Sequence, residues 1–352
     1  MLETFAEQLA AAQALSDEQI HQAVEVLADG EFSAVIKAEF LTALALKGET
    51  PAEIAAFARA LRAKSVPVPL DEDVRSREIL DIVGTGGDRL GTFNISTSAA
   101  ILCAAAGVTV AKHGNRAATS QAGSADVLEA LGIRIDLTPA EAVRSLREKN
   151  FAFFFAPGFH PAFAHITAAR KLCAGRGQRT IFNFLGPLLN PVQPSAMLVG
   201  VSRPELCEPL AQVLQSLGVR RGMVVAGKVA SEPGTGPAAV LDELSTLGEN
   251  TIAEFYHARG FTASGLSLDS FPLQPARLAD LLGGDKFQNA EITRRILRGA
   301  ERGPKRDAVL LNAGAALFVA GKTKSLTEGW ELAAETIDSG RAGAKLTELA
   351  QS

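Results

Sequence analysis

The chain has 352 residues, of which 47% are hydrophobic and 21% are charged. This composition can fill a large core and is long enough for two domains, and it excludes collagen-like, low-complexity and largely disordered proteins. The formal net charge of −4, without any block of five or six like charges, argues against a surface that binds nucleic acid or an acidic membrane.

The cysteines and the apolar segments indicate the cellular compartment of the protein. Cys103, Cys173 and Cys207 are too irregularly spaced for a disulfide framework or a thiolate metal site, so we expect reduced core residues. The N-terminal segment carries Glu3 and Glu7 and no basic region, which is typical of an amphipathic helix and not of a signal peptide. The longest apolar stretch is shorter than the roughly 18 residues that span a bilayer. We therefore expect a cytoplasmic protein without a membrane segment.

Up to about residue 64 the chain has a helical pattern. Ser16 pairs with Gln19 in a capping box, Gly48 is placed to end a helix, and the sequence from Thr50 is typical of a helix start. The following segment, 65–77, contains two prolines and has no periodicity, which predicts a linker. The sequence thus predicts a small all-helical domain over residues 1–68 and a larger domain over residues 78–352.

In the larger domain, short β-rich runs alternate with helices, which predicts an α/β fold with a mainly parallel central sheet. Helix starts are indicated by Thr138 with Glu141, by the segment 202–205, and by Ser325 with Glu328. The predicted strands are ILDIV (79–83), VTVAK (108–112), IRIDL (133–137), FAFFFA (151–156), AMLVGV (196–201), GMVVAG (222–227) and TIAEFY (251–256).

The turn after the first of these strands, GTGGD (84–88), is rich in glycine and leads into a Ser/Thr-rich helix start. Exposed backbone amides and a helix N-terminus together bind phosphate oxygens, so this turn predicts an anion site. A dinucleotide fingerprint does not fit, because Arg89 stands at its last glycine and Lys112 stands where a ribose-binding acid is needed. Residues 222–229 resemble a P-loop, but Val229 replaces the magnesium-binding hydroxyl.

A second anion site is predicted at the end of the next strand, where KHGNR (112–116) precedes a loop rich in hydroxyl groups and glycine (119–124). Basic residues, glycines and a helix start together indicate a pyrophosphate site in which Lys112 neutralises charge. His113 and the later His160 have a structural alternative, in which they satisfy backbone groups.

Asp242 and Glu243 are adjacent carboxylates that follow a Gly/Pro-rich loop. Mg²⁺ is typically held by one or two protein carboxylates together with substrate phosphates, so this pair is a candidate metal site. Its structural alternative is an ordinary surface turn.

Taken in order, the motifs resemble those of anthranilate phosphoribosyltransferases from one end of the chain to the other. The resemblance implies Mg²⁺-dependent transfer of the phosphoribosyl group of phosphoribosyl pyrophosphate to anthranilate, in tryptophan biosynthesis. It also implies a homodimer formed through the helical domains, which would borrow a helix from residues 164–174. It rests on GTGGD, NIST, KHGNR, the GS-x-D loop end, FHPA, RTIFNFLGPLLNP, DE-L-S, NAGAAL and DSGRA.

The resemblance also implies roles for single residues. For anthranilate, Arg170 would pair with the carboxylate, to which a guanidinium is suited, and Asn115 would lie near the amine. The segment between Arg170 and RTIFN is longer than in the family, so Arg176 and Arg179 are alternatives for this role. The full anthranilate set would be Gly84, His113, Asn115, His160 and Arg170, and the metal ligands would be Ser96, Asp242 and Glu243. The phosphoribosyl pyrophosphate set would be Gly84, Gly87, Asp88, Thr92, Asn94, Ser96, Thr97, Lys112 and Ser124.

Without a convincing Ser-His-Asp set, the sequence favours electrostatic stabilisation of a leaving pyrophosphate over covalent catalysis. Two other functions compete. A pyrimidine nucleoside phosphorylase also acts at an anomeric carbon, but its glycine loop and basic motif differ from GTGGD and KHGNR. A non-catalytic relative that binds nucleic acid is disfavoured by the acidic net charge and by the presence of both anion motifs.

Overall fold

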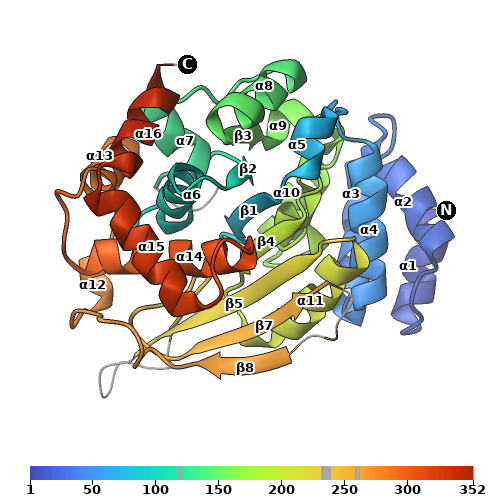
Figure 1. Cartoon of the computed structure of the whole chain (residues 1–352). Helices are drawn as coiled ribbons and strands as arrows, with labels where there is room; N and C mark the ends of the chain where they lie inside the picture. Colours follow the sequence, from blue (N-terminus) through green and yellow to red (C-terminus); the bar gives the residue numbers. More distant parts are fainter. Residues whose placement is uncertain (118–120, 231–238, 258–259, 261, 352) are drawn as a thin grey trace.

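A bundle of four N-terminal helices lies beside an α/β domain in the computed structural model, which describes residues 1–117, 121–230, 239–257, 260 and 262–351 (Figure 1). The bundle helices are α1 (Leu2–Ala10), α2 (Asp17–Ala28), α3 (Ala34–Lys47) and α4 (Pro51–Ala63), and the short α5 (Glu72–Ser76) lies in the expected linker. No helix in the described ranges is long and apolar enough to cross a membrane.

The bundle helices begin and end where the sequence predicts. Ser16 caps α2 and Thr50 caps α4, each in a reciprocal capping box, which satisfies amides that the first helical turn leaves free. Gly48 ends α3 with a positive φ of 86°, a conformation that glycine adopts without steric cost. These predictions are confirmed.

A helix from the middle of the chain, α10 (Thr167–Gly175), packs against the bundle. Cys173 lies 3.5 Å from the carbonyl oxygen of Ala38 on α3, and the same core holds Ala169 and residues of α1 to α4. The buried Lys37 ammonium donates to the carbonyl of His165, just before α10. The borrowed helix is thus found against the bundle, while the domain boundaries at 68 and 78 stay predictions.

The central sheet has the strand order β3-β2-β1-β4-β5-β7-β8, with β6 paired to β5. Strands β3, β2, β1, β4 and β5 pair in parallel. Strands β6 and β7 each pair antiparallel with β5, and β8 pairs antiparallel with β7, so the prediction of a mainly parallel sheet is confirmed. The strands are β1 (Ile79–Gly84), β2 (Thr109–Gly114), β3 (Phe151–Phe155), β4 (Ala196–Gly200), β5 (Arg221–Val229), β6 (Ala239–Leu241), β7 (Asn250–Tyr256) and β8 (Thr262–Leu266).

The sheet separates two cores, because successive side chains of a strand point to opposite faces. Leu198 of β4 belongs to the core under α6 and α14, whereas Met197 and Val199 belong to the core shared with the bundle. The remaining helices are α6 (Ile95–Ala105), α7 (Ser124–Ala130), α8 (Pro139–Lys149), α9 (Ala156–Phe159), α11 (Cys207–Ser216), α12 (Leu278–Leu281), α13 (Lys286–Leu297), α14 (Pro304–Val319), α15 (Leu326–Asp338) and α16 (Arg341–Ala350).

Two predicted elements are wrong. Residues 133–137 alternate buried and exposed side chains as a strand would, but they do not pair with the sheet and so form no strand. Their two isoleucines are nevertheless buried in the core, which explains the alternating pattern. Helix α11 begins at Cys207 and not at the predicted start 202–205, because a short 3-10 helix at Pro204–Leu206 precedes it. The Ser202 hydroxyl lies against the turn at Gly87, so it does not cap a helix.

The two other predicted helix starts are correct. Thr138 caps α8 in a reciprocal box. The Ser325 hydroxyl accepts from the amide of Glu328 at the start of α15, but the Glu328 carboxylate accepts from the amide of Lys324 and not from Ser325.

Candidate active site

The predicted anion sites and the acidic pair meet at the carboxyl ends of the central parallel strands. The segment that begins with Asp242 crosses over the ends of β1 and β4 at very short distance. A Cβ atom at Gly84 would lie 2.7 Å from the Asp242 carboxylate, and one at Gly200 would lie 1.7 Å from the Asp242 carbonyl oxygen. Only glycine fits at these strand ends, and this close approach brings the acidic pair to the turn 84–88.

Two buried asparagines hold the crossing segment in place. The Asn312 side chain on α14 accepts from the Leu244 amide at 3.0 Å and donates to the Leu244 carbonyl at 2.9 Å. Asn250 accepts from the Ser245 amide at 2.7 Å. Sequence reasoning missed both residues, although a buried asparagine within the apolar part of α14 is a signal that a polar partner exists.

The acidic pair lies beside the first turn, with Asp242 buried and Glu243 half-buried. The Gly86 amide and the Thr85 hydroxyl donate to the Asp242 carboxylate, and the Ser96 amide donates to Glu243 at 3.2 Å. Burial, the charge of Asp88 and the charge of Glu243 all raise the pKa of Asp242. Burial raises the pKa of Glu243 to about 7, although Lys112 opposes this shift.

This acidic cluster fits a divalent cation. Its positive charge would reduce the repulsion between the Asp242 and Glu243 carboxylates and offset the cost of burying their negative charge. In the described residues, no group of three or more His, Cys, Asp or Glu side chains is arranged to hold a metal by itself.

Lys112 lies under this cluster. Its ammonium is buried and donates to the Ile82 carbonyl at 2.6 Å, and it lies 3.5 Å from the Ser96 hydroxyl. Burial lowers the pKa of Lys112, while the charges of Asp81 and Glu243 oppose this shift. The lysine is therefore an electrostatic partner for the buried carboxylates.

Asp81 is a structural member of the site that sequence reasoning missed. Its fully buried carboxylate accepts from the His113 amide at 3.3 Å and from the Asn190 side chain at 2.9 Å. Burial raises the pKa of Asp81 to about 6, although Lys112 opposes this shift. A charged residue inside the apolar strand ILDIV was the available signal.

The remaining residues of the predicted donor set lie around the start of α6 and the end of β2. The Asn94 side chain donates to the Ala122 carbonyl and accepts from Asn289. The buried Thr97 hydroxyl has no partner among the described residues. Thr92 forms an isolated antiparallel bridge with Leu282. Ser124 begins α7 beside Gly114 at the end of β2, while Thr119 and Ser120 of the predicted loop lie outside the described residues.

Three predicted acceptor residues, His113, His160 and Arg170, lie along a row of rings that Phe163 and Phe182 complete. The rings of His113 and His160 are 5.3 Å apart, and His160 stacks on Phe163 at 5.2 Å. Phe163 contacts Phe182 at 5.8 Å, and the Arg170 guanidinium lies 5.5 Å from the Phe182 ring centre. The row thus runs from the end of β2 to α10.

Burial keeps the two histidines of this row neutral. It lowers the pKa of His113 to about 3 and that of His160 to about 4. The Nε2 atom of each ring is buried without a hydrogen-bond partner in the described part of the chain. Asn115 lies nearby on the exposed side of the same turn, where its side chain accepts from the Arg116 amide. A bound ligand would be a suitable hydrogen-bond partner for the buried Nε2 atoms of His113 and His160.

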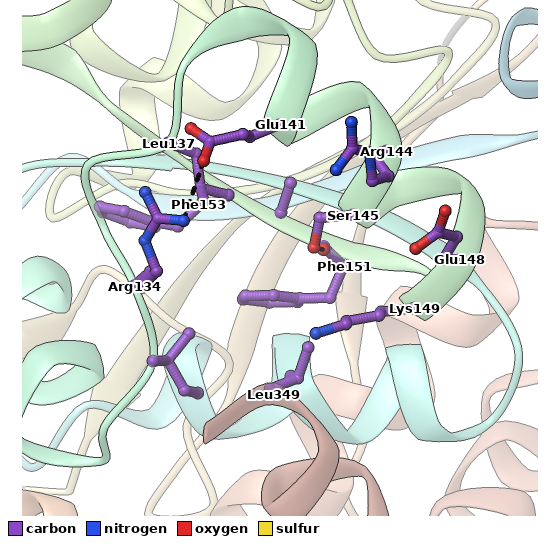
Figure 2. A pocket seen from close by; sticks show the side chains of 12 residues that line it. Arg134, Leu137, Glu141, Arg144, Ser145, Glu148, Lys149, Phe151, Phe153 and Leu349 are labelled. Carbon is purple, nitrogen blue, oxygen red and sulfur yellow. Dashed lines mark hydrogen bonds and ion pairs between the residues drawn. The ribbon is translucent and has the colours of Figure 1, made fainter. Parts of the chain in front are cut away.

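A separate cavity of about 160 Å³ lies between α8, β3 and the end of α16 (Figure 2). Its wall includes Phe151, Phe153 and Leu349, together with the ion pair of Arg134 and Glu141. None of the predicted substrate or metal residues lines it. It is therefore not the centre of the chemistry described above.

Comparison with known proteins agrees with this geometry. Residues 4–65 match the glycosyl transferase family helical bundle domain, and residues 76–343 match the glycosyl transferase family a/b domain. An anthranilate phosphoribosyltransferase of Lacticaseibacillus paracasei is 45% identical over 95% of this chain and 92% of its own length. The enzyme of that name from Thermus thermophilus is 46% identical over 93% of this chain and 92% of its own.

Solved structures give the same result. The crystal structure of anthranilate phosphoribosyltransferase from Thermus thermophilus has a TM-score of 0.86 and 43% identity, over 99% of this chain and 98% of that chain. The Saccharomyces cerevisiae enzyme in complex with PRPP and Mg has a TM-score of 0.85 and 29% identity, over 99% and 97% of the two chains.

Proposed function

The chain belongs to the anthranilate phosphoribosyltransferase family, and we propose that it transfers the phosphoribosyl group of phosphoribosyl pyrophosphate to the amino group of anthranilate. The products are N-(5-phosphoribosyl)anthranilate and pyrophosphate, in a step of tryptophan biosynthesis. The observation that carries this proposal is the close approach of Asp242 and Glu243 to the turn 84–88 and to the start of α6, above the buried Lys112.

We propose that the donor binds across the ends of β1 and β2. The first amides of α6 and the glycine-rich turn present backbone N–H groups to phosphate oxygens, and Lys112 supplies positive charge below them. The Thr97 hydroxyl, which has no partner in the described ranges of the chain, supports a ligand at this position. The proposed donor residues are Gly84, Gly87, Asp88, Thr92, Asn94, Ser96, Thr97, Lys112 and Ser124.

Mg²⁺ would be held by Asp242, Glu243 and the Ser96 hydroxyl together with donor phosphates. When bound, it neutralises charge that grows on the leaving pyrophosphate. In the reaction the bond between the anomeric carbon and pyrophosphate breaks, a bond to the amine nitrogen forms, and the amine loses a proton. Lys112 and the backbone amides stabilise the leaving group, and positioning of the two substrates lowers the remaining barrier.

For the acceptor, we propose the ring row between α10 and the end of β2. Gly84, His113, Asn115 and His160 would surround the amine end, and the Arg170 cation at the outer end would attract the acceptor carboxylate. Because burial holds both histidines neutral near pH 7, they would act as hydrogen-bonding groups and not as a charged acid.

A homodimer and a cytoplasmic location complete the proposal. Val35 and Leu46 on α3 and Leu172 on α10 are exposed apolar side chains on neighbouring helices, which supports an interface there. All three cysteines are buried free thiols, which is typical of a reducing compartment.

The test is the loss of anthranilate fluorescence when purified protein is mixed with phosphoribosyl pyrophosphate and Mg²⁺. We expect a decay that requires the donor and that EDTA abolishes. A folded protein that produces no decay would refute the proposed reaction. Phosphate-dependent cleavage of a pyrimidine nucleoside would then be measured, since it distinguishes the phosphorylase alternative.

A further inference from the structure

Three side chains from different elements converge on one short turn, η3 (Gly186–Leu189). The Arg62 Nε atom, near the end of α4, donates to the Leu188 carbonyl at 2.6 Å. The His113 ring is hydrogen-bonded to the backbone of Gly186, and the His160 ring to the backbone of Leu189. The bundle thus reaches the acceptor histidines through Arg62.

Each of these side chains leaves a second nitrogen buried without a partner. The unpartnered atoms are one terminal nitrogen of the Arg62 guanidinium and the Nε2 atoms of His113 and His160, within the part of the chain that the structure describes. Arg62 is only 8% exposed, and in the same described part no carboxylate forms an ion pair with it. An unpaired cation in this position is costly unless an anion joins it.

The charge on Arg62 persists at neutral pH. Burial lowers the pKa of Arg62 only to about 10, so the guanidinium remains protonated. Its positive charge contributes to the lowered pKa of both His113 and His160, which places it within electrostatic range of the pair. The Arg62 guanidinium can donate to a carboxylate. Each neutral imidazole already donates to the backbone of η3, so its Nε2 atom can only accept, for example from the amine of the acceptor, and nothing among the three groups balances the cation.

We propose that Arg62 is a second cation for the acceptor and binds the carboxylate of the aromatic amine beside His113 and His160. The proposal rests on the proposed function, because it names the acceptor's partner at the inner end of the ring row. Arg170 lies at the outer end of that row, over Phe182. Arg170 then attracts the incoming anion, and Arg62 holds it where the amine reacts. Since these three nitrogens are buried, the side chains that cover them have to move for the acceptor to reach them.

The test compares Arg62→Gln with Arg59→Gln, a matched control that removes an exposed arginine of the same helix, paired with Asp17. Binding of anthranilate and of its neutral amide is titrated by fluorescence, and transfer kinetics are measured in parallel. For Arg62→Gln we expect anthranilate affinity to fall about 10- to 100-fold, with less than about a threefold change for the amide. The donor KM stays unchanged, and Arg59→Gln behaves as wild type.

An equal loss of affinity for the acid and the amide would overturn the proposal, since Arg62 would then only fasten α4 to the Leu188 carbonyl. If Arg62→Gln does not fold, Arg62→Lys keeps the charge, and preference for the acid over the amide should persist. Loss of that preference in a folded Arg62→Lys would also overturn it. Wild-type protein that binds the acid in an Arg62-dependent way but transfers nothing would refute the proposed function and leave this inference standing.

Discussion

Replacing Gly200 by alanine should displace the acidic pair without touching a side chain of the site. The new Cβ would lie 1.7 Å from the Asp242 carbonyl oxygen and 2.3 Å from its carbonyl carbon, whereas ordinary contact begins at 3.4 Å. Both atoms belong to the backbone, so rotating a side chain cannot relieve the overlap. The crossing segment must therefore move by more than 1 Å from the end of β4.

Such a shift removes the Asp242 carboxylate from the Gly86 amide and changes the place of the metal relative to the donor. Misplacement of this size typically lowers a rate by about 100-fold, so we expect kcat to fall by roughly that factor and the Mg²⁺ requirement to rise. The assay is the fluorescence decay over a Mg²⁺ series, with thermal unfolding measured alongside.

Gly175→Ala is the matched control, because a Cβ there meets nothing within 4 Å. We expect it to retain wild-type activity and stability. If Gly200→Ala is folded and also has wild-type kcat and Mg²⁺ dependence, then the exact path of the crossing segment does not govern catalysis, and our reasoning about the metal site is wrong.

Three further outcomes are expected. Asp242→Asn with Glu243→Gln should lower turnover by orders of magnitude while thermal unfolding shows a folded protein; wild-type activity would exclude the metal role. Burial depresses the pKa of His113 and His160, so they add stability above the unfolded pKa of about 6.5 that is lost as pH falls towards 4 and 3; urea titrations should show this loss, and a double substitution to glutamine should flatten it. Leu46→Glu should shift a dimer to monomer in sedimentation; an unchanged dimer would place the interface elsewhere.

The local elements and the site motifs follow from sequence patterns alone. Capping pairs such as Ser16 with Gln19 act between residues three apart, so their hydrogen bonds can be predicted without any tertiary contact. The same locality explains the predicted strands and the turn 84–88. It also explains the failure at 133–137, where alternating burial has the period of a strand but no neighbouring strand pairs with it.

What only the tertiary structure decides is which distant residues meet. The sequence around Gly200, Asn312 and Arg62 does not identify their partners, since each acts on a partner from 42 to 126 residues away. Gly200 leaves room for the crossing segment, and Asn312 holds that segment by hydrogen bonds. Arg62 places a positive charge near the acceptor histidines. The sequence by itself determined the fold class, the motifs and the family resemblance, because these depend on short-range patterns. The placement of charges in the buried site depended on packing, since burial and close approach exist only after the chain has folded.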